Sequence, residues 1–150
     1  MSDLKDRLRA DLTAAMKARD ALRASTLRMT LTEVTNAEVA GATARELSDA
    51  EVLEVLDKEA KKRREAAEAF DQAGRAELAT KERSEGEILA EYLPAQLSED
   101  ELAGIVRAAV TEAGASGMKD MGKVMKIVQP QVKGRAEGGR VAAAVRAQLG

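Results

Sequence analysis

Three lysines in the last third of the chain are spaced so that they could bind an anion together. Lys119, Lys123 and Lys126 follow a spacing of i, i+4 and i+7, which places them in one narrow sector of a helix. Ammonium groups aligned in this way repel one another unless an anion neutralises them, so the pattern is typical of a phosphate-binding ridge. The alternative is an ordinary solvated face, and the spacing alone leaves both interpretations open.

A second basic segment follows at residues 133–140, which read Lys-Gly-Arg-Ala-Glu-Gly-Gly-Arg and lead into the last predicted helix. Glycines allow a phosphate or another backbone to approach the first N–H groups of a helix, which lack intrahelical partners. A plain connection between two helices would show the same glycines, and the Gly-Lys-Ser/Thr signature of a P-loop is absent. The candidate binding residues are Lys119, Lys123, Lys126, Lys133, Gly134, Arg135 and Arg140.

The net charge of -2 hides an uneven distribution of charge along the chain. Residues 1–94 hold 16 Lys and Arg against 20 Asp and Glu, a net charge of -4. Residues 118–150 hold 7 against 2, a net charge of +5. A basic C-terminal part on an acidic body indicates an anionic partner.

Catalysis is difficult to assemble from these residue types. The chain contains no cysteine and no histidine, which excludes disulfides, thiolate nucleophiles and the commonest general base and metal ligand. A hydroxyl nucleophile needs an activating base; Ser116 near Lys119 is the remaining formal pair, and no oxyanion site accompanies it. We therefore expect no catalytic residues of its own, no cofactor and no metal site.

The sequence also indicates where in the cell the protein is expected to be found. The first residues are charged and contain no apolar h-region, so they do not resemble a signal peptide. No apolar run approaches the ~18 residues that a membrane-spanning helix needs. We expect a cytoplasmic protein with no membrane association.

The elements that position these residues are predicted to be helices throughout. Two capping boxes mark helix starts, at Ser48 with Glu51 and at Ser98 with Glu101. Pro94 ends the helix before it and opens a short linker over 94–97. The expected helices are about 2–18, 20–40, 48–73 and 75–93, then 98–113, 117–132 and 138–149. Three glycines before residue 95 and eight after it favour long helices first and short ones later.

The predicted fold class is therefore all-α, with a four-helix N-terminal subdomain (1–94) and a three-helix C-terminal subdomain (95–150). In the helix that carries the lysines, we expect Met118, Met121, Met125 and Val128 to form the packed arc. In the third helix, Arg63 shares an arc with Val52 and Leu56 and follows Glu59 by one turn. This spacing predicts a buried or interfacial ion pair with a structural role.

Several segments in this order resemble the GatB/YqeY family, in particular its stand-alone YqeY-like proteins. They are Met118-Lys-Asp-Met-Gly-Lys-Val-Met125 with Lys133-Gly-Arg-Ala136, Glu91-Tyr-Leu-Pro-Ala-Gln-Leu97, Lys58-Glu-Ala-Lys-Lys-Arg-Arg-Glu65 and Arg23-Ala-Ser-Thr-Leu-Arg28. The resemblance covers essentially the whole chain and implies a two-part all-helical fold. One departure is Glu137 at a position where Asp is expected, and Glu is the poorer N-cap.

The resemblance also implies a function. The C-terminal module is similar to the tail of the B subunit of the glutamine-dependent tRNA amidotransferase, which contacts tRNA while the chemistry lies in other domains. Carbon–nitrogen ligase activity with glutamine as amide donor is thus associated with the family and not with a site in this chain. We expect a tRNA-associated accessory protein that binds structured RNA, with tRNA or proteins of aminoacyl-tRNA metabolism as partners.

Two alternatives remain open. The chain could be a helical adapter whose Met-bearing helix docks on another protein, or a non-catalytic component of a tRNA amidotransferase. Salt dependence separates RNA binding from apolar docking, because phosphate contacts weaken steeply with salt. With one Phe and one Tyr, the chain cannot stack several unpaired bases, so recognition would have to use phosphates and helix shape.

Overall fold

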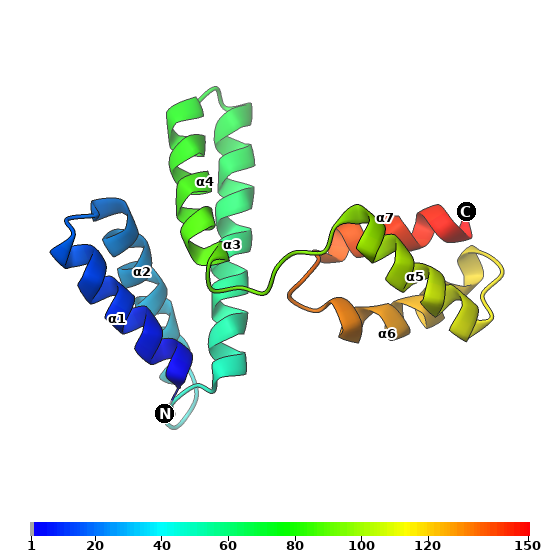
Figure 1. Ribbon diagram of the computed structural model, residues 1–150, viewed down its shortest axis with the longest axis horizontal. Helices are drawn as coiled ribbons and strands as arrows, with labels where there is room; N and C mark the ends of the chain where they lie inside the picture. The colour runs from blue at the N-terminus through cyan, green and yellow to red at the C-terminus, as the bar shows by residue number, and fades with distance from the viewer. Residues whose placement is uncertain (1) are drawn as a thin grey trace. The chain divides into compact units, whose positions relative to one another are not determined.

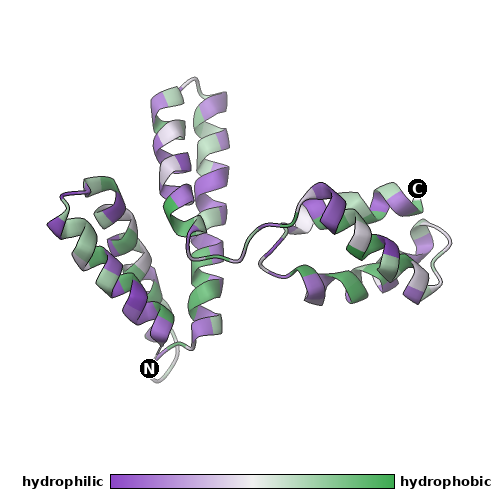
Figure 2. Ribbon diagram, in the orientation of Figure 1, coloured by the Kyte–Doolittle hydropathy of each residue, from purple (hydrophilic) through white to green (hydrophobic). Residues whose placement is uncertain are grey.

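The computed structural model of the protein describes residues 2–150 and is helical throughout (Figure 1). Over this range it contains seven α-helices, one short 3₁₀ helix and no β-strand, which confirms the all-α prediction. The chain divides into two compact units, Met1–Leu93 and Pro94–Gly150. Each unit has a hydrophobic core of its own, and hydrophobic residues recur along each helix between hydrophilic ones (Figure 2).

The first unit is built from two helical hairpins, α1 with α2 and α3 with α4 (Figure 1). Its helices are α1 (Asp3–Lys17), α2 (Ala21–Glu38), α3 (Asp49–Gln72) and α4 (Ala76–Ala90). Aliphatic side chains from all four helices meet in one buried cluster, whose fully buried members are Leu8, Leu27, Val34, Val52, Leu56 and Leu89. Burying such side chains is the main favourable contribution to folding, about 1.5–3 kcal/mol each.

The turn between α1 and α2 is made without glycine or proline. Arg19 adopts a left-handed backbone conformation, with φ of 57°, which is uncommon for a residue with a Cβ atom. Asp20 then caps α2, because its carboxylate accepts the Arg23 N–H at 3.1 Å. The break predicted at this point therefore exists, and its signal in the sequence is the aspartate cap.

The end of α4 is fastened to α1 and α2 by Tyr92. Its ring is buried, its hydroxyl donates a hydrogen bond to Asp11 and the Arg7 guanidinium lies over the ring at 4.6 Å from the centroid. Beside it, Arg23 donates to Glu91 at 2.9 Å. Burial, followed by the bond to Asp11, raises the pKa of the Tyr92 hydroxyl well above its usual range.

A buried ionic network joins α3 to α4. Arg63 Nη1 donates to Glu59 Oε2 at 2.8 Å, and Arg63 Nε lies 3.3 Å from Glu85 Oε2 without making a hydrogen bond. All three side chains are buried. The predicted Glu59–Arg63 ion pair is confirmed, and Glu85 is an additional partner from the neighbouring helix.

The second unit is a three-helix arrangement around a core of valine and leucine (Figure 1). Its elements are α5 (Glu99–Ala113), the 3₁₀ helix η1 (Met118–Asp120), α6 (Met121–Val132) and α7 (Gly138–Leu149). Ser98 and Glu101 form the predicted capping box at the start of α5, and Gly114 ends that helix in the left-handed conformation. Both features were readable from the sequence.

The predicted linker over 94–97 is shorter than expected. Leu97 is buried in the core of the second unit and its N–H donates to the Arg135 carbonyl at 2.8 Å. The Gln96 side chain donates to the Gly134 carbonyl at 3.2 Å. Residues 96 and 97 are thus bonded into the second unit, which begins at Pro94.

Candidate nucleic-acid interface

The position of the basic side chains in the second unit follows from the buried face of α6. Val124, Val128 and Val132 are buried in the core. The predicted packed arc is confirmed for Val128, which is buried, and for Met121 and Met125, which are half-buried and pack against the core. It is wrong for Met118, which is 46% exposed. The cause is η1, because residues 118–120 wind as a tighter 3₁₀ turn and shift Met118 off the face that a continuous α-helix would give it.

The three lysines of this region are all exposed. Lys119 lies in η1, and Lys123 and Lys126 lie on α6 among residues that point away from the valine core. Within the described residues, neither Lys119 nor Lys126 forms an ion pair. Their ammonium groups therefore remain available to an external anion.

Asp120 moderates the charge at the start of α6. Its carboxylate accepts the Ser116 N–H at 3.0 Å and lies 3.9 Å from the Lys123 ammonium. The hydrogen bond from Ser116, followed by the charges of Lys123 and Lys119, lowers the pKa of Asp120. Because the side chain of Lys123 is 71% exposed, this contact is weak and leaves its ammonium in solvent.

The connection between α6 and α7 is held by its backbone. Gly134 has a φ of 77°, which favours glycine, and the N–H groups of Arg135 and Ala136 both donate to the Val132 carbonyl. Lys133 is exposed and Arg135 is half-buried. The Gly134 and Arg135 carbonyls accept hydrogen bonds from residues 96 and 97. The connection between α6 and α7 is therefore held against the segment that precedes α5.

Arg140, one of the predicted binding residues, forms hydrogen bonds within the second unit. Its guanidinium donates to the Leu97 carbonyl at 2.9 Å and to the Glu99 carboxylate at 2.7 Å. These bonds fasten the first turn of α7 to the start of α5. The Glu137 side chain makes no cap hydrogen bond to α7, as its poorer capping ability predicts.

The predicted residues therefore lie at two places. Lys119 in η1 and Lys123 in the first turn of α6 lie at one end of that helix, whereas Lys133, Gly134 and Arg135 follow its other end. A helical rise of 1.5 Å per residue separates these places by roughly 20 Å, with Lys126 between them. A single phosphate cannot contact both ends, but a chain of phosphates can.

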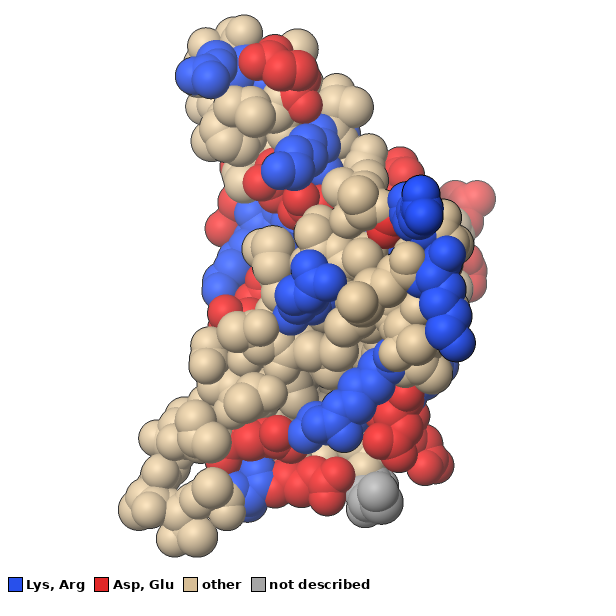
Figure 3. Space-filling view, turned by 90° about the vertical axis from the view of Figure 1, so that its left-hand side faces the viewer, with Lys and Arg blue, Asp and Glu red and all other residues tan. Residues whose placement is uncertain are grey.

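One group of cations in the first unit was not singled out by the sequence pattern. Lys5, Arg9 and Arg28 line a groove between α1 and α2. Figure 3 shows the side of the molecule on which these helices lie: several Lys and Arg side chains cross a largely uncharged central area, and Asp and Glu gather at its lower end. Knowledge that α1 and α2 form a hairpin would have been needed to bring Arg9 and Arg28 together.

The described residues contain no group of three or more Asp and Glu placed to hold a metal ion. None of the described helices combines the length and the apolar character needed to cross a membrane. The chemistry that the second unit offers is that of an exposed basic surface on a rigid helical frame.

Comparison with known proteins identifies the family. The fold is that of a small all-helical protein with a basic C-terminal unit, and residues 5–149 match the family described as Yqey-like protein. The chain therefore belongs to the YqeY-like family. It is 39% identical over 92 residues to a fission yeast protein, "Uncharacterized protein C22F3.15" of Schizosaccharomyces pombe, covering 61% of this chain and 72% of that protein.

Proposed function

We propose that the protein binds structured RNA, tRNA in the first place, through the basic surface of its C-terminal unit and without catalysis of its own. The observation that carries the proposal is the exposure of Lys119, Lys123 and Lys126 beside a valine core that fixes their helix. Exposed cations on a rigid element position a protein on a phosphate backbone. The net charge of +5 over residues 118–150 supplies the sequence-independent attraction.

The C-terminal unit has no aromatic residues, and this indicates which kind of nucleic acid it binds. Phe70 and Tyr92 are the chain's two aromatic residues, and both lie outside residues 95–150. The unit therefore cannot stack unpaired bases on aromatic rings, which is how single-stranded RNA is commonly read. Double-stranded regions, which are recognised by shape and by phosphate and ribose contacts, suit this surface better.

The resemblance of residues 118–136 to the tail of an amidotransferase B subunit supports tRNA as the RNA. In that subunit the tail contacts tRNA, and the amide transfer takes place elsewhere. A tail-like basic segment in a chain without cysteine or histidine favours an accessory role in aminoacyl-tRNA metabolism. The family's association with carbon–nitrogen ligation is then explained by the shared RNA-binding module.

The test is a charge-reversal variant, Lys119→Glu with Lys123→Glu and Lys126→Glu, titrated with total tRNA at two salt concentrations. A matched control reverses three exposed lysines of the first unit, Lys58, Lys61 and Lys81. We expect the first variant to bind at least tenfold more weakly than the control. Removal of three phosphate contacts should reduce the salt slope by about 2–2.7.

The control is essential because both variants change the net charge of the protein by the same amount. If the two variants bind tRNA equally, with folds shown intact by circular dichroism, the C-terminal surface is not the RNA-binding site. If the wild type does not bind tRNA even at low salt, the proposal as a whole is wrong.

A second candidate function rests on the exposed methionine at the start of α6. Met118 is 46% exposed and Met121 and Met125 are half-buried beside it, which is a suitable surface for docking another helix. In this case the protein is a helical adapter. Binding of its partner would be insensitive to salt and would be lost in Met118→Ser, whereas tRNA binding would be unaffected by that change.

A further inference from the structure

The groove between α1 and α2 is lined by cationic side chains, although the first part of the chain is acidic overall. It has a volume of about 280 Å³. Its walls are formed by Lys5, Arg9, Leu12, Arg28, Leu31, Thr32, Thr35 and Asn36. Three of these side chains are cationic and none is a carboxylate, although residues 1–94 carry a net charge of -4.

One of the three cations is already neutralised within the chain. The Lys5 ammonium donates to both carboxylate oxygens of Glu38, at 2.7 and 2.9 Å. Glu38 also accepts the Leu47 N–H at 3.1 Å. The bond from Lys5 lowers the pKa of Glu38, so the pair stays ionised and closes one end of the groove as a structural element.

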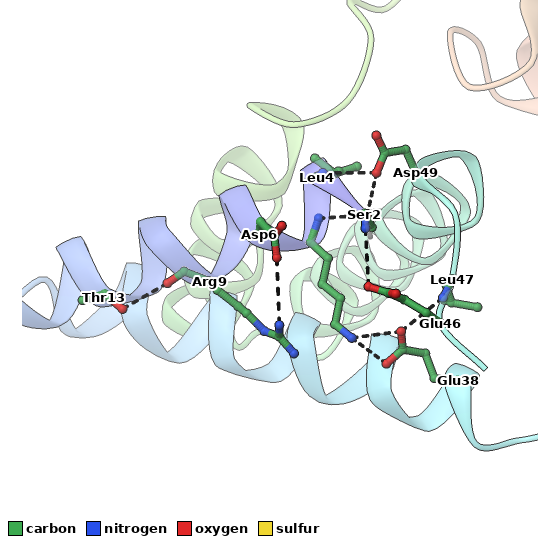
Figure 4. A network of polar contacts seen from close by, with 10 residues as sticks. Ser2, Leu4, Asp6, Arg9, Thr13, Glu38, Glu46, Leu47 and Asp49 are labelled. Atoms are coloured by element: carbon green, nitrogen blue, oxygen red, sulfur yellow. Dashed lines mark hydrogen bonds and ion pairs between the residues drawn. The ribbon is translucent and has the colours of Figure 1, made fainter. Parts of the chain in front are cut away.

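Arg9 and Arg28 remain as the two cations able to bind a ligand. Arg9 is exposed, and its contact with Asp6 spans 4.0 Å, the outer limit of an ion pair (Figure 4). Arg28 is exposed and forms no ion pair within residues 2–150. The two guanidinium groups come from different helices and line the same groove, an arrangement that suits bidentate recognition of a phosphate from two sides.

The other walls indicate that the phosphate belongs to a larger molecule. Leu12 and Leu31 are half-buried: they pack against the core of the unit, and their exposed parts form an apolar wall of the groove. They can pack against the carbons of a ribose. Thr35 and Asn36 add neutral hydrogen-bonding groups at the α2 side of the groove, which is the chemistry that ribose hydroxyls require.

We propose that the groove between α1 and α2 holds a phosphate of an RNA backbone between Arg9 and Arg28, as a second contact of the chain with RNA. This inference rests on the proposed RNA-binding function and assigns a binding role to the first unit as well. Two carboxylates contact the groove cations within the chain: Glu38 binds Lys5, and Asp6 lies 4.0 Å from Arg9.

The test compares two charge-matched variants of the full chain. The groove variant is Arg9→Gln with Arg28→Gln, which keeps the side-chain stems and polar ends. The control is Lys58→Gln with Lys61→Gln, which removes two exposed charges from α3 of the same unit. We expect the groove variant to bind tRNA about tenfold more weakly than wild type and with a salt slope reduced by about 0.7–0.9, the value for one lost phosphate contact, while the control stays within about twofold.

The outcomes separate this inference from the proposed function. If the groove variant and the control bind tRNA equally, the groove is not an RNA contact, even where the Lys119, Lys123 and Lys126 variant has lost binding. If that lysine variant binds like wild type while the groove variant does not, the groove stands and the C-terminal surface fails. Absence of tRNA binding by the wild type overturns both.

Competition distinguishes phosphate from other anions. Polyglutamate and inorganic phosphate are added to the complex of wild type and labelled tRNA at matched charge concentration and constant ionic strength. Unlabelled tRNA should displace the label at far lower concentration than either competitor. Equal displacement by polyglutamate would show that an acidic protein segment binds as well as RNA, and equal displacement by inorganic phosphate would show a free-anion site. Either result overturns the proposal.

Discussion

The Arg140 guanidinium donates a hydrogen bond to the backbone carbonyl of Leu97 at 2.9 Å. The N–H of Leu97 in turn donates to the Arg135 carbonyl, so one buried leucine links the segment before α7 with the entrance to α5. Arg140 also contacts Glu99, whose side chain is mostly exposed. Arg140 therefore stabilises the second unit, and this role limits what it can contribute to ligand binding.

Replacement of Arg140 by glutamine should lower the stability of the protein by about 1 kcal/mol, since a charge-assisted bond to a carbonyl is lost while the exposed Glu99 contact contributes little. Urea denaturation followed by circular dichroism measures the change. Arg146→Gln, at an exposed position of the same helix, is the control and should stay within about 0.5 kcal/mol. Equal effects of the two changes would mean that the bond to Leu97 does not stabilise the unit.

Replacement of Ser98 by alanine should destabilise the second unit by about 0.5–2 kcal/mol, because the Ser98 hydroxyl accepts the Glu101 N–H at 3.1 Å and the cap is lost. Ser98→Asp retains an N-cap acceptor and should recover most of the stability. The measurement is the midpoint of thermal or urea unfolding. A midpoint that is the same for alanine and aspartate would show that the start of α5 does not depend on this cap.

The helices were predictable because their ends carry local chemical signals. Both capping boxes and the glycine at the end of α5 act through neighbouring residues, and the sequence contains all that is needed to recognise them. The exposure of Met118 was not predictable in the same way. A 3₁₀ turn at Met118 depends on how η1 joins the packed unit, and periodicity at 100° per residue assumes that no such turn exists. Whether the two parts are separately folding subdomains stays a prediction.

The residues of the candidate site also fall into two groups, those that could be placed from the sequence and those that could not. Exposure of Lys123 and Lys126 follows from helical spacing, because these residues fall between apolar positions of α6. Lys119 lies in η1, before the α-helix begins, and is exposed there as well. The engagement of Arg140 depends on Leu97 and Glu99, which are more than 40 positions away in the chain, and could not be seen in the sequence. The same holds for Arg9 and Arg28, which only the pairing of α1 with α2 brings to one groove.

Tyr92 is the chain's single tyrosine and there is no tryptophan, so ultraviolet absorbance reports its ionisation directly. Burial and the bond to Asp11 raise the pKa of Tyr92, so the folded protein should show no tyrosinate signal near pH 10, where an exposed tyrosine titrates. The raised pKa means that stability is intact below pH 10 and falls as the pH rises further, because the unfolded chain releases the proton first.

Alkaline titration with parallel circular dichroism checks this prediction. Tyrosinate absorbance should appear together with the loss of helix and not before it. Asp11→Asn, which replaces the charged acceptor, should allow ionisation at lower pH. An absorbance change near pH 10 in the folded protein would contradict the buried position of Tyr92.

The network of Arg63 with Glu59 and Glu85 gives the largest expected effect on stability. Arg63→Met removes the one guanidinium that lies between two buried carboxylates. Breaking a buried ionic network by removing one partner typically costs about 3–5 kcal/mol. We expect the lower end of this range, because Glu85 is left without Arg63 in a poorly solvated place while Glu59 keeps the Lys62 ammonium at 3.2 Å. Arg64→Met, at an exposed neighbouring position, is the control and should have little effect.

A triple variant separates the cost of uncompensated charge from the loss of the side chain. Adding Glu59→Gln and Glu85→Gln to Arg63→Met removes both buried charges and should recover most of the lost stability, since neutral replacement of a buried ionic group is often close to neutral in energy. Urea denaturation of all four proteins, with Arg64→Met included, gives the comparison. If the triple variant is no more stable than Arg63→Met alone, packing of the arginine stem between α3 and α4 matters more than its charge. If Arg63→Met costs no more than Arg64→Met, the network does not hold the second hairpin together.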